Sequence, residues 1–251
     1  MSEEELIQQL GGAHGPRVYA KFQRKGFLQS DRSKMKIPAR IKFAFDEHRF
    51  RSLWKKYSAY TMIPERQYCG NLRLAANAAS VQGSVVECGT WRGGMIAGIA
   101  DILGGGRSYY LCDSFQGLPP AKGIDGEAAR AWQTDTSSPD YHNNCTASES
   151  EARSAMAKSK VKDYSVVKGW FQDTLPNFPQ TPIALLRMDA DWYDSTKCIL
   201  DNLACRIVRG GMIIIDDYYT WEGCTLAVNE YAAQHKWQIR QNCDGVCYVV
   251  V

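Results

Sequence analysis

The chain has 251 residues, of which 45% are hydrophobic and 23% charged, and its formal net charge is +3. This length and composition support a hydrophobic core of ordinary size and exclude disordered and fibrous chains. No purely aliphatic stretch exceeds four residues, and the acidic start lacks a secretory signal pattern, so we expect a soluble, cytoplasmic protein whose nine cysteines are free.

The charge is unevenly distributed along the chain. Residues 1–60 contain 13 Lys or Arg against 6 Asp or Glu, whereas residues 61–251 contain 17 against 21. A basic segment can attract an anionic ligand or nucleic acid, but it can equally be the solvated face of a helix. This one lacks the interleaved basic and aromatic residues of a nucleic-acid groove. We therefore predict an N-terminal helical arm, residues 1–60, on a main domain, residues 61–251, with no nucleic-acid or membrane partner.

From about residue 65, short apolar strand-like segments alternate with longer amphipathic segments. The predicted strands cover residues 84–88, 108–112, 164–167, 183–188 and 212–215, and the predicted helices cover residues 65–80, 93–103, 148–159, 195–207 and 222–234. This alternation predicts an α/β fold with a mostly parallel sheet that is covered on both faces. Residues 237–240 and 246–251, joined by an Asp-Gly turn, are expected to complete a seven-stranded sheet as an antiparallel hairpin.

Two regions interrupt this alternation. Residues 1–60 include a helical stretch at 40–56 but no strand, and residues 114–147 are rich in Gly, Pro, Ser, Asn and Asp. Connections longer than ~15 residues in a compact domain are usually functional lids or disordered segments. We expect residues 114–147 to be a lid loop and expect the arm to cover the same active site.

A glycine-rich turn, Glu87-Cys-Gly-Thr-Trp-Arg-Gly-Gly94, follows the first predicted strand. Ligands of open parallel sheets bind beyond the carboxyl ends of the strands, and glycines let a ligand approach the backbone. The spacing from Gly89 to Gly93 differs from the Gly-x-Gly-x-x-Gly fingerprint of dinucleotide sites. Glu87 favours a ligand that carries a positively charged amine over a ligand that carries phosphates.

The second predicted strand ends at Asp113, 24 residues after Gly89. A carboxylate at this place can accept hydrogen bonds from both hydroxyls of a ribose. An Asp before Ser114 can also simply cap a turn or a helix. A nucleoside ligand without a pyrophosphate indicates S-adenosylmethionine.

Carboxylates follow the fourth and fifth strands: Asp189, Asp191 and Asp194 after the fourth, and Asp216 and Asp217 after the fifth. Adjacent strand ends would bring Asp189 or Asp191 together with the second pair, where like charges repel unless a cation or a shared proton offsets them. Mg²⁺ or a similar hard ion fits, because these segments contain no His or Cys. In the alternative interpretation Asp194 caps the next helix, and one residue of the second pair faces solvent.

At these positions the sequence resembles the macrocin O-methyltransferase (TylF-type) family. The similar segments are the glycine-rich turn, Asp113-Ser-Phe-Gln-Gly-Leu-Pro119, Asp189-Ala-Asp-Trp-Tyr-Asp-Ser-Thr196 and Gly210-Gly-Met-Ile-Ile-Ile-Asp-Asp-Tyr218, within a resemblance that runs from about residue 61 to the C-terminus. It implies a Rossmann-like class I methyltransferase fold. It also implies an enzyme that uses S-adenosylmethionine and Mg²⁺ to methylate a hydroxyl of a sugar or another natural product, as in antibiotic biosynthesis. The glycine-rich turn has Glu-Cys-Gly-Thr where the family more often has Glu-x-Gly-Val.

The resemblance also implies roles for individual residues. The cofactor would contact Glu87, Gly89, Thr90 and Gly93 at its methionine end, Asp113 and Ser114 at its ribose, and Gly169, Trp170 and Phe171 at its adenine. The family's metal and base carboxylates would fall on Asp191, Asp216 and Asp217, and Asp189, which is close in register, is a further candidate ligand. Asp191 and Asp189 are also the two candidates for the catalytic base.

The sequence is compatible with three alternatives. The acceptor could be a glycoside, or a catechol or other phenol, because vicinal oxygens that can hold a metal occur in all of them. An NAD-dependent oxidoreductase on a similar sheet would bind nicotinamide and no metal. A non-catalytic binding module would have no need of a mutually repelling carboxylate cluster. The arm is expected to contribute to the acceptor lid or to the contact of a homodimer.

Overall fold

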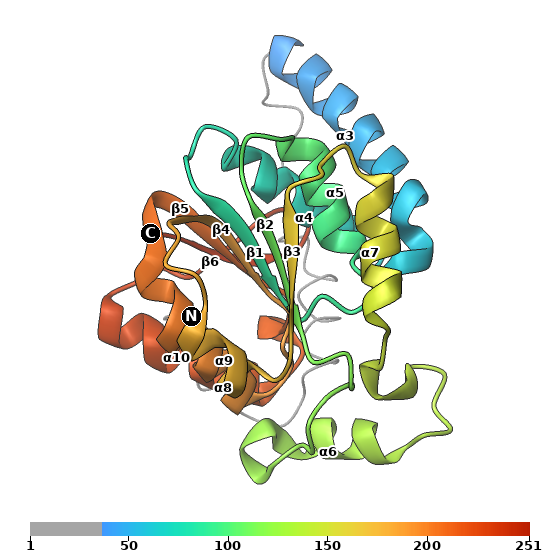
Figure 1. Cartoon of the computed structure of the whole chain (residues 1–251), viewed down its shortest axis with the longest axis vertical. Helices are drawn as coiled ribbons and strands as arrows, with labels where there is room; N and C mark the ends of the chain where they lie inside the picture. Colours follow the sequence, from blue (N-terminus) through green and yellow to red (C-terminus); the bar gives the residue numbers. More distant parts are fainter. Residues whose placement is uncertain (1–36) are drawn as a thin grey trace.

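The computed structural model describes the backbone of residues 37–251 and side chains from residue 46 onward, so most of the predicted arm lies outside the described residues. Seven strands form one sheet in the order β3-β2-β1-β4-β5-β7-β6 (Figure 1). β1 to β5 pair in parallel, and β7 runs antiparallel to both β5 and β6. The predicted α/β class, the mostly parallel sheet and the C-terminal antiparallel hairpin are confirmed.

The strands are β1 (Ser84–Cys88), β2 (Tyr109–Asp113), β3 (Tyr164–Lys168), β4 (Ile183–Met188), β5 (Ile207–Ile215), β6 (Arg240–Gln241) and β7 (Cys247–Val250). Two of them differ from the predicted bounds by more than one residue. β5 begins at Ile207, which pairs with Ile183, but the exposed Arg209 and Gly210 interrupt its apolar pattern. β6 is shorter than predicted and begins later, because Trp237 N bonds Ala232 O at the end of the preceding helix.

Helices cover both faces of the sheet (Figure 1). They are α3 (Ile37–Tyr57), α4 (Glu65–Asn77), α5 (Gly94–Leu103), α6 (Gly126–Thr134), α7 (Glu149–Lys158), α8 (Phe171–Thr174), α9 (Tyr193–Leu203) and α10 (Glu222–His235). Val85 belongs to a core formed with α3, α4, α5 and α7, whereas its neighbour Val86 belongs to a core formed with α9 and α10. Successive strand residues point to opposite faces, so burial on both sides accounts for the continuous apolar strands.

α3 contains the helical stretch expected at residues 40–56 and joins the first core through Phe50 and Tyr57. The C-terminal end of α3 is held by Asp101 of α5. Tyr57 OH donates to Asp101 Oδ2 at 2.8 Å, and Lys56 Nζ lies 2.6 Å from the same oxygen. The chain then turns at Tyr60, whose carbonyl lies close to Gly94 at the start of α5. This part of the predicted arm is therefore packed against the main domain.

Residues 114–147 are more ordered than the predicted lid loop. The segment contains α6 and two short 3-10 turns, at Gly123–Asp125 and Asn143–Cys145. The helix was missed because, of its nine residues, only Gly126 and Ala129 are buried, which leaves no apolar stripe to recognise. The segment lies beyond the carboxyl ends of the parallel strands, beside α9 (Figure 1).

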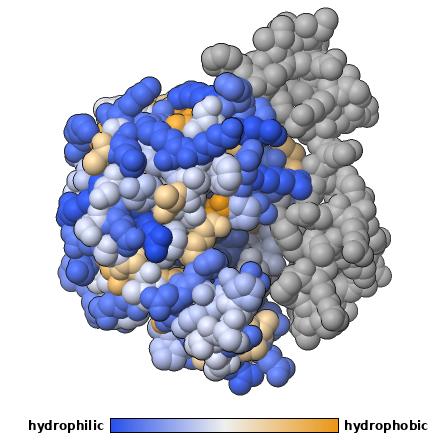
Figure 2. All heavy atoms as spheres, turned by 90° about the vertical axis from the view of Figure 1, so that its right-hand side faces the viewer, coloured by the Kyte–Doolittle hydropathy of each residue, from blue (hydrophilic) through white to orange (hydrophobic). Residues whose placement is uncertain are grey.

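The surface in Figure 2 is mostly hydrophilic, and its hydrophobic areas are small and scattered. No helix within residues 37–251 is long and apolar enough to cross a bilayer. All nine cysteines are free, as predicted, and five of them are buried.

Candidate active site

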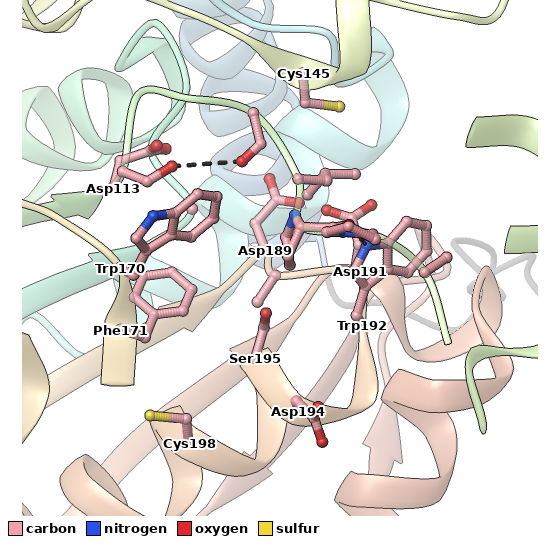
Figure 3. A pocket seen from close by; sticks show the side chains of 18 of the residues that line it. Asp113, Cys145, Trp170, Phe171, Asp189, Asp191, Trp192, Asp194, Ser195 and Cys198 are labelled. Atoms are coloured by element: carbon pink, nitrogen blue, oxygen red, sulfur yellow. Dashed lines mark hydrogen bonds between the residues drawn. The ribbon is translucent and has the colours of Figure 1, made fainter. Parts of the chain in front are cut away.

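A cavity of about 590 Å³ lies beyond the carboxyl ends of β1 to β4 (Figure 3). Its wall includes most of the residues predicted from the sequence: Gly89, Asp113, Ser114, Gly169, Trp170, Phe171, Asp189 and Asp191. Its volume falls in the range of small-molecule sites. The other predicted residues do not line the cavity: Glu87, Thr90, Gly93, Asp216 and Asp217.

The glycine-rich turn is pressed against the end of β4. Gly89 has a φ of 83°, and a Cβ atom there would lie 1.5 Å from the carbonyl oxygen of Asp189. No side chain fits at this position. The contact brings the turn after β1 and the carboxylates after β4 to the same side of the cavity.

Asp113 joins the turns that follow β1 and β2. Its Oδ2 accepts a hydrogen bond from Trp91 N at 2.8 Å, and its Oδ1 accepts one from Phe115 N at 2.7 Å. Burial raises the pKa of the Asp113 carboxyl, and these backbone bonds oppose the shift. The carboxylate thus has the turn-forming role that the sequence allowed, and Asp113 also lines the cavity.

Glu87 is a buried carboxylate with one free oxygen. Its Oε1 accepts a hydrogen bond from Arg187 Nη1 at 3.1 Å, whereas its Oε2 is buried without a partner. Burial raises the pKa of Glu87, Arg187 opposes the shift, and the resulting pKa is about 8. An unpaired buried oxygen costs free energy, and a ligand's ammonium group would satisfy it. This feature fits the amine that Glu87 was predicted to bind.

Arg187 was not predicted as a site residue, yet its buried guanidinium connects three carboxylates. Besides Glu87, it contacts Asp189 Oδ2 at 2.9 Å through Nη1 and Asp216 Oδ1 at 2.6 Å through Nη2. Its Nε donates to Asn71 Oδ1 at 3.0 Å. A charged residue inside the apolar strand Ile183–Met188 was the sequence signal for this role.

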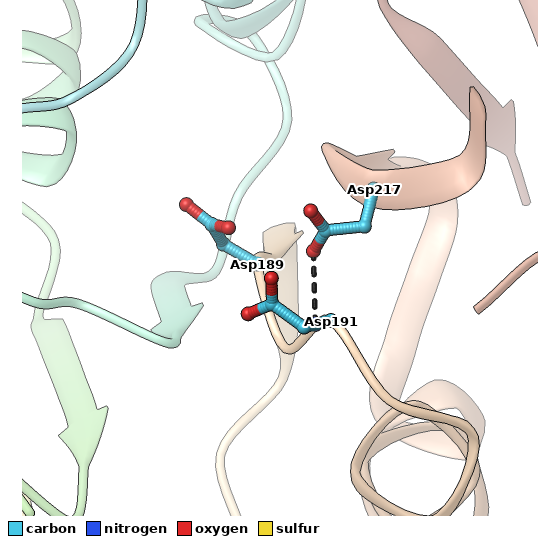
Figure 4. Close-up of side chains that lie close together, drawn as sticks. All are labelled: Asp189, Asp191 and Asp217. Atoms are coloured by element: carbon cyan, nitrogen blue, oxygen red, sulfur yellow. Dashed lines mark hydrogen bonds between the residues drawn. The ribbon is translucent and has the colours of Figure 1, made fainter. Parts of the chain in front are cut away.

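Asp189, Asp191 and Asp217 form a group in which one carboxylate oxygen from each residue lies within 4.8 Å of the other two (Figure 4). Asp217 Oδ2 accepts hydrogen bonds from the backbone N–H groups of Ala190 and Asp191, both at 3.0 Å. Asp216 is not one of the three, and its Oδ1 contacts Arg187. Three of the four predicted ligand candidates thus converge, the fourth contacts a buried guanidinium, and the identity of the metal ligands stays a prediction.

Mutual repulsion and burial both act on this group. Burial is the main cause that raises the pKa of Asp189 to about 6, where Arg187 opposes the shift and the charge of Asp216 adds to it. Burial, together with the charge of Asp189, raises the pKa of Asp191 to about 8. Burial and the same neighbours raise the pKa of Asp217 well above its usual range. Converging carboxylates of this kind need shared protons or a cation, and three oxygen ligands are a donor set that suits a hard divalent ion.

The segment 114–147 is fastened to the loop that carries these carboxylates. Trp192 Nε1 donates to Pro119 O at 2.9 Å, and the buried Asp125 accepts hydrogen bonds from Tyr193 N and Lys122 N, both at 2.7 Å. The N-cap of α9 is Trp192, so the suggestion that Asp194 caps this helix is wrong. The Asp194 side chain instead pairs with Lys122 from the fastened segment.

The sheet order and a ligand cavity at the carboxyl ends of its strands define a class I S-adenosylmethionine-dependent methyltransferase. The structure is similar to that of the O-methyltransferase NovP, with 30% identity, a TM-score of 0.63 and coverage of 76% of this chain and 81% of the other. It shares its fold with the calicheamicin methyltransferase CalS11 at 19% identity and a TM-score of 0.59, over 88% of this chain and 96% of the other.

The macrocin O-methyltransferase (TylF) family model matches residues 6–249, so the chain belongs to this family. It is 38% identical over 188 residues to demethyldecarbamoylnovobiocin O-methyltransferase of Streptomyces niveus, across 70% of this chain and 69% of the relative. It is 33% identical over 187 residues to mycinamicin III 3''-O-methyltransferase of Micromonospora griseorubida, across 70% and 72%. The predicted family, fold and enzyme class are confirmed. The chain is an S-adenosylmethionine-dependent O-methyltransferase, and this class displaces the oxidoreductase and binding-module alternatives.

Proposed function

We propose that this enzyme methylates a hydroxyl of a sugar or phenol within a natural product and that it requires Mg²⁺ or a similar divalent cation. The convergence of Asp189, Asp191 and Asp217 carries the metal requirement, because the three carboxylates lie within 4.8 Å and need a compensating charge. The names of relatives that act on derivatives of novobiocin and mycinamicin support the acceptor class.

S-adenosylmethionine supplies the methyl group when it is bound. Its ammonium group would satisfy the unpaired Glu87 Oε2, and its ribose would lie against Asp113 and Ser114. The ring faces of Trp170 and Phe171 offer the adenine an aromatic surface beside Gly169 (Figure 3). Thr90 and Gly93 act indirectly in this proposal, by shaping the turn that begins at Gly89.

A divalent cation, when bound by Asp189, Asp191 and Asp217, supplies Lewis acidity that lowers the pKa of the acceptor hydroxyl. Asp189 suits a ligand role, because Arg187 already fixes its Oδ2. Asp191 has no ion pair with any described residue and faces the cavity, so it accepts the acceptor's proton. We leave Asp216 out of the ligand set because it is not one of the three carboxylates that converge.

The acceptor would lie between the three converging carboxylates (Asp189, Asp191 and Asp217) and a cover made by two segments. Leu118, Pro119 and Lys122 of the segment 114–147 line the cavity, and so does Met62, which follows α3. The arm, residues 1–60, extends this cover or provides a homodimer contact. Light scattering of the purified chain, with and without residues 1–36, tests the dimer.

A labelled-methyl assay tests the proposal with a panel of glycosides and catechols. Stripping divalent ions with a chelator should abolish transfer, and Mg²⁺ should restore it. Asp217→Asn should lower kcat by at least about a hundredfold, while the affinity for S-adenosylhomocysteine stays within about twofold. Full activity after chelation would contradict the metal requirement, and activity on none of the panel would contradict the acceptor class.

A further inference from the structure

Trp221 directly precedes α10 and contacts the Asp191 carboxylate, although it does not line the cavity. Its Nε1 donates a hydrogen bond to Asp191 Oδ1 at 2.9 Å. In the part of the chain that the structure describes, no second side-chain donor reaches the Asp191 carboxylate. Because Trp221 does not line the cavity, it would act on a substrate through Asp191.

Asp191 needs two separate restraints. Its φ of 56° lies in the left-handed region, which a residue with a Cβ atom adopts at a cost in free energy. The two hydrogen bonds to Asp217 Oδ2 hold this backbone conformation. They leave the side-chain torsions of Asp191 free, and the bond from Trp221 fixes the carboxylate.

The indole of Trp221 is itself held in place. Its ring packs edge to face against Trp192 and Trp132, with centroid separations of 5.2 Å and 5.9 Å. Its backbone N–H donates to Asp217 O at 3.1 Å. The three rings, here called the aromatic cluster, connect α6, the loop after β4 and the start of α10. The donor therefore reaches Asp191 from a rigid support, as a precise site requires.

We propose that Trp221 is a positioning residue for Asp191. Its indole N–H holds Oδ1 and so directs Oδ2 toward the acceptor hydroxyl and the cation. This inference rests on the proposed function, which gives Asp191 its roles in proton transfer and cation binding. A hydrogen-bond partner behind a ligating carboxylate typically changes metal affinity or activity by 10–100-fold.

Trp221→Phe keeps an aromatic ring and removes the N–H. The matched control is Trp132→Phe, in the same cluster, whose N–H donates to Asp140 O away from the cavity. For Trp221→Phe we expect Mn²⁺ affinity, measured by calorimetry, and kcat to fall by about tenfold or more each. The affinity for S-adenosylhomocysteine and the KM for the acceptor should stay within about twofold, and Trp132→Phe should leave all four values within about twofold.

Equal Mn²⁺ affinity and equal kcat in the two variants would overturn the positioning role. So would a joint loss of S-adenosylhomocysteine affinity in Trp221→Phe, since that indicates a general disturbance of packing. A wild-type protein that methylates no acceptor would contradict the proposed function, and the Mn²⁺ affinities would still decide the role of Trp221. If the wild type binds no Mn²⁺, the proposed cation requirement is wrong. The kcat values of the two variants then test the positioning role of Trp221.

Discussion

At the scale of single residues, Arg187 determines how the negative charges of the site are distributed. Its guanidinium is 1% exposed and contacts Glu87, Asp189 and Asp216, which belong to three different strand ends. It holds one carboxylate oxygen of Asp189 and one of Asp216, whereas Asp217 accepts hydrogen bonds from backbone N–H groups instead. The same contact holds Glu87 in an orientation that leaves Oε2 unpaired.

Arg187→Met should therefore destabilise the metal-free protein strongly. Removing one partner of a buried charge network leaves uncompensated charges, and we expect the free energy of unfolding in urea to fall by about 3 kcal/mol. Saturating Mg²⁺ should recover part of this loss by supplying a replacement charge. Arg153→Met is the control, because its pair with Glu149 is exposed and should contribute less than about 0.5 kcal/mol. Similar losses for both variants would show that the network contributes little.

At the scale of elements, the segment 114–147 is a fixed wall of the cavity. Asp125 is 2% exposed, and its two carboxylate oxygens accept hydrogen bonds from Lys122 N and Tyr193 N. It thereby joins the start of α6 to the start of α9. In the proposed function, Leu118, Pro119 and Lys122 of this wall would order the acceptor, whereas Ser114 at its start would contact the cofactor.

Asp125→Ala should loosen this wall. Hydrogen bonds to a charged group contribute about 1.5–3 kcal/mol, so we expect the KM for the acceptor to rise about tenfold. The dissociation constant of S-adenosylhomocysteine, measured by calorimetry, should change by less than about twofold. Asp135→Ala, where the lost bonds reach only Ser137 in the same exposed turn, should leave both values unchanged. An unchanged KM in Asp125→Ala would show that the wall does not order the acceptor.

The contrast between strands and loops explains what could be predicted from the sequence. The bounds predicted for β1 and β4 agree with the structure, because strands buried on both faces are mostly apolar, even though Glu87 and Arg187 lie within these two. Asp216 was placed in the metal group because neighbouring strand ends converge, but convergence does not say which way a side chain turns. Arg187 decides that direction, through contacts between residues far apart in the chain. Trp221 gave no sequence signal, because its bond to Asp191 crosses 30 residues.

At the scale of the whole molecule, stability is coupled to the charge of the site. Glu87, Asp189 and Asp191 all have folded-state pKa values above those of exposed carboxyls, at about 8, 6 and 8, and burial is the main cause. Between about pH 5 and 8 the folded protein therefore retains protons that the unfolded chain has released. Stability falls with rising pH wherever the folded state binds more protons.

We accordingly expect the free energy of unfolding of the metal-free protein to be greatest near pH 5 and to decrease up to about pH 8, where the shifted groups have ionised. Carboxyls with lowered pKa values, such as Asp101 and Glu149, do not oppose this trend. The stability that they contribute is lost only at lower pH, where they become protonated. Urea unfolding across this range measures the slope. Mg²⁺ should reduce the slope of stability against pH by stabilising the ionised carboxylates. Glu87→Gln should also reduce this slope, because it removes one of the groups that titrate. A metal-free stability that rises from pH 5 to pH 8 would show that these carboxyls are ionised in the folded protein throughout, which would remove the need for a compensating cation.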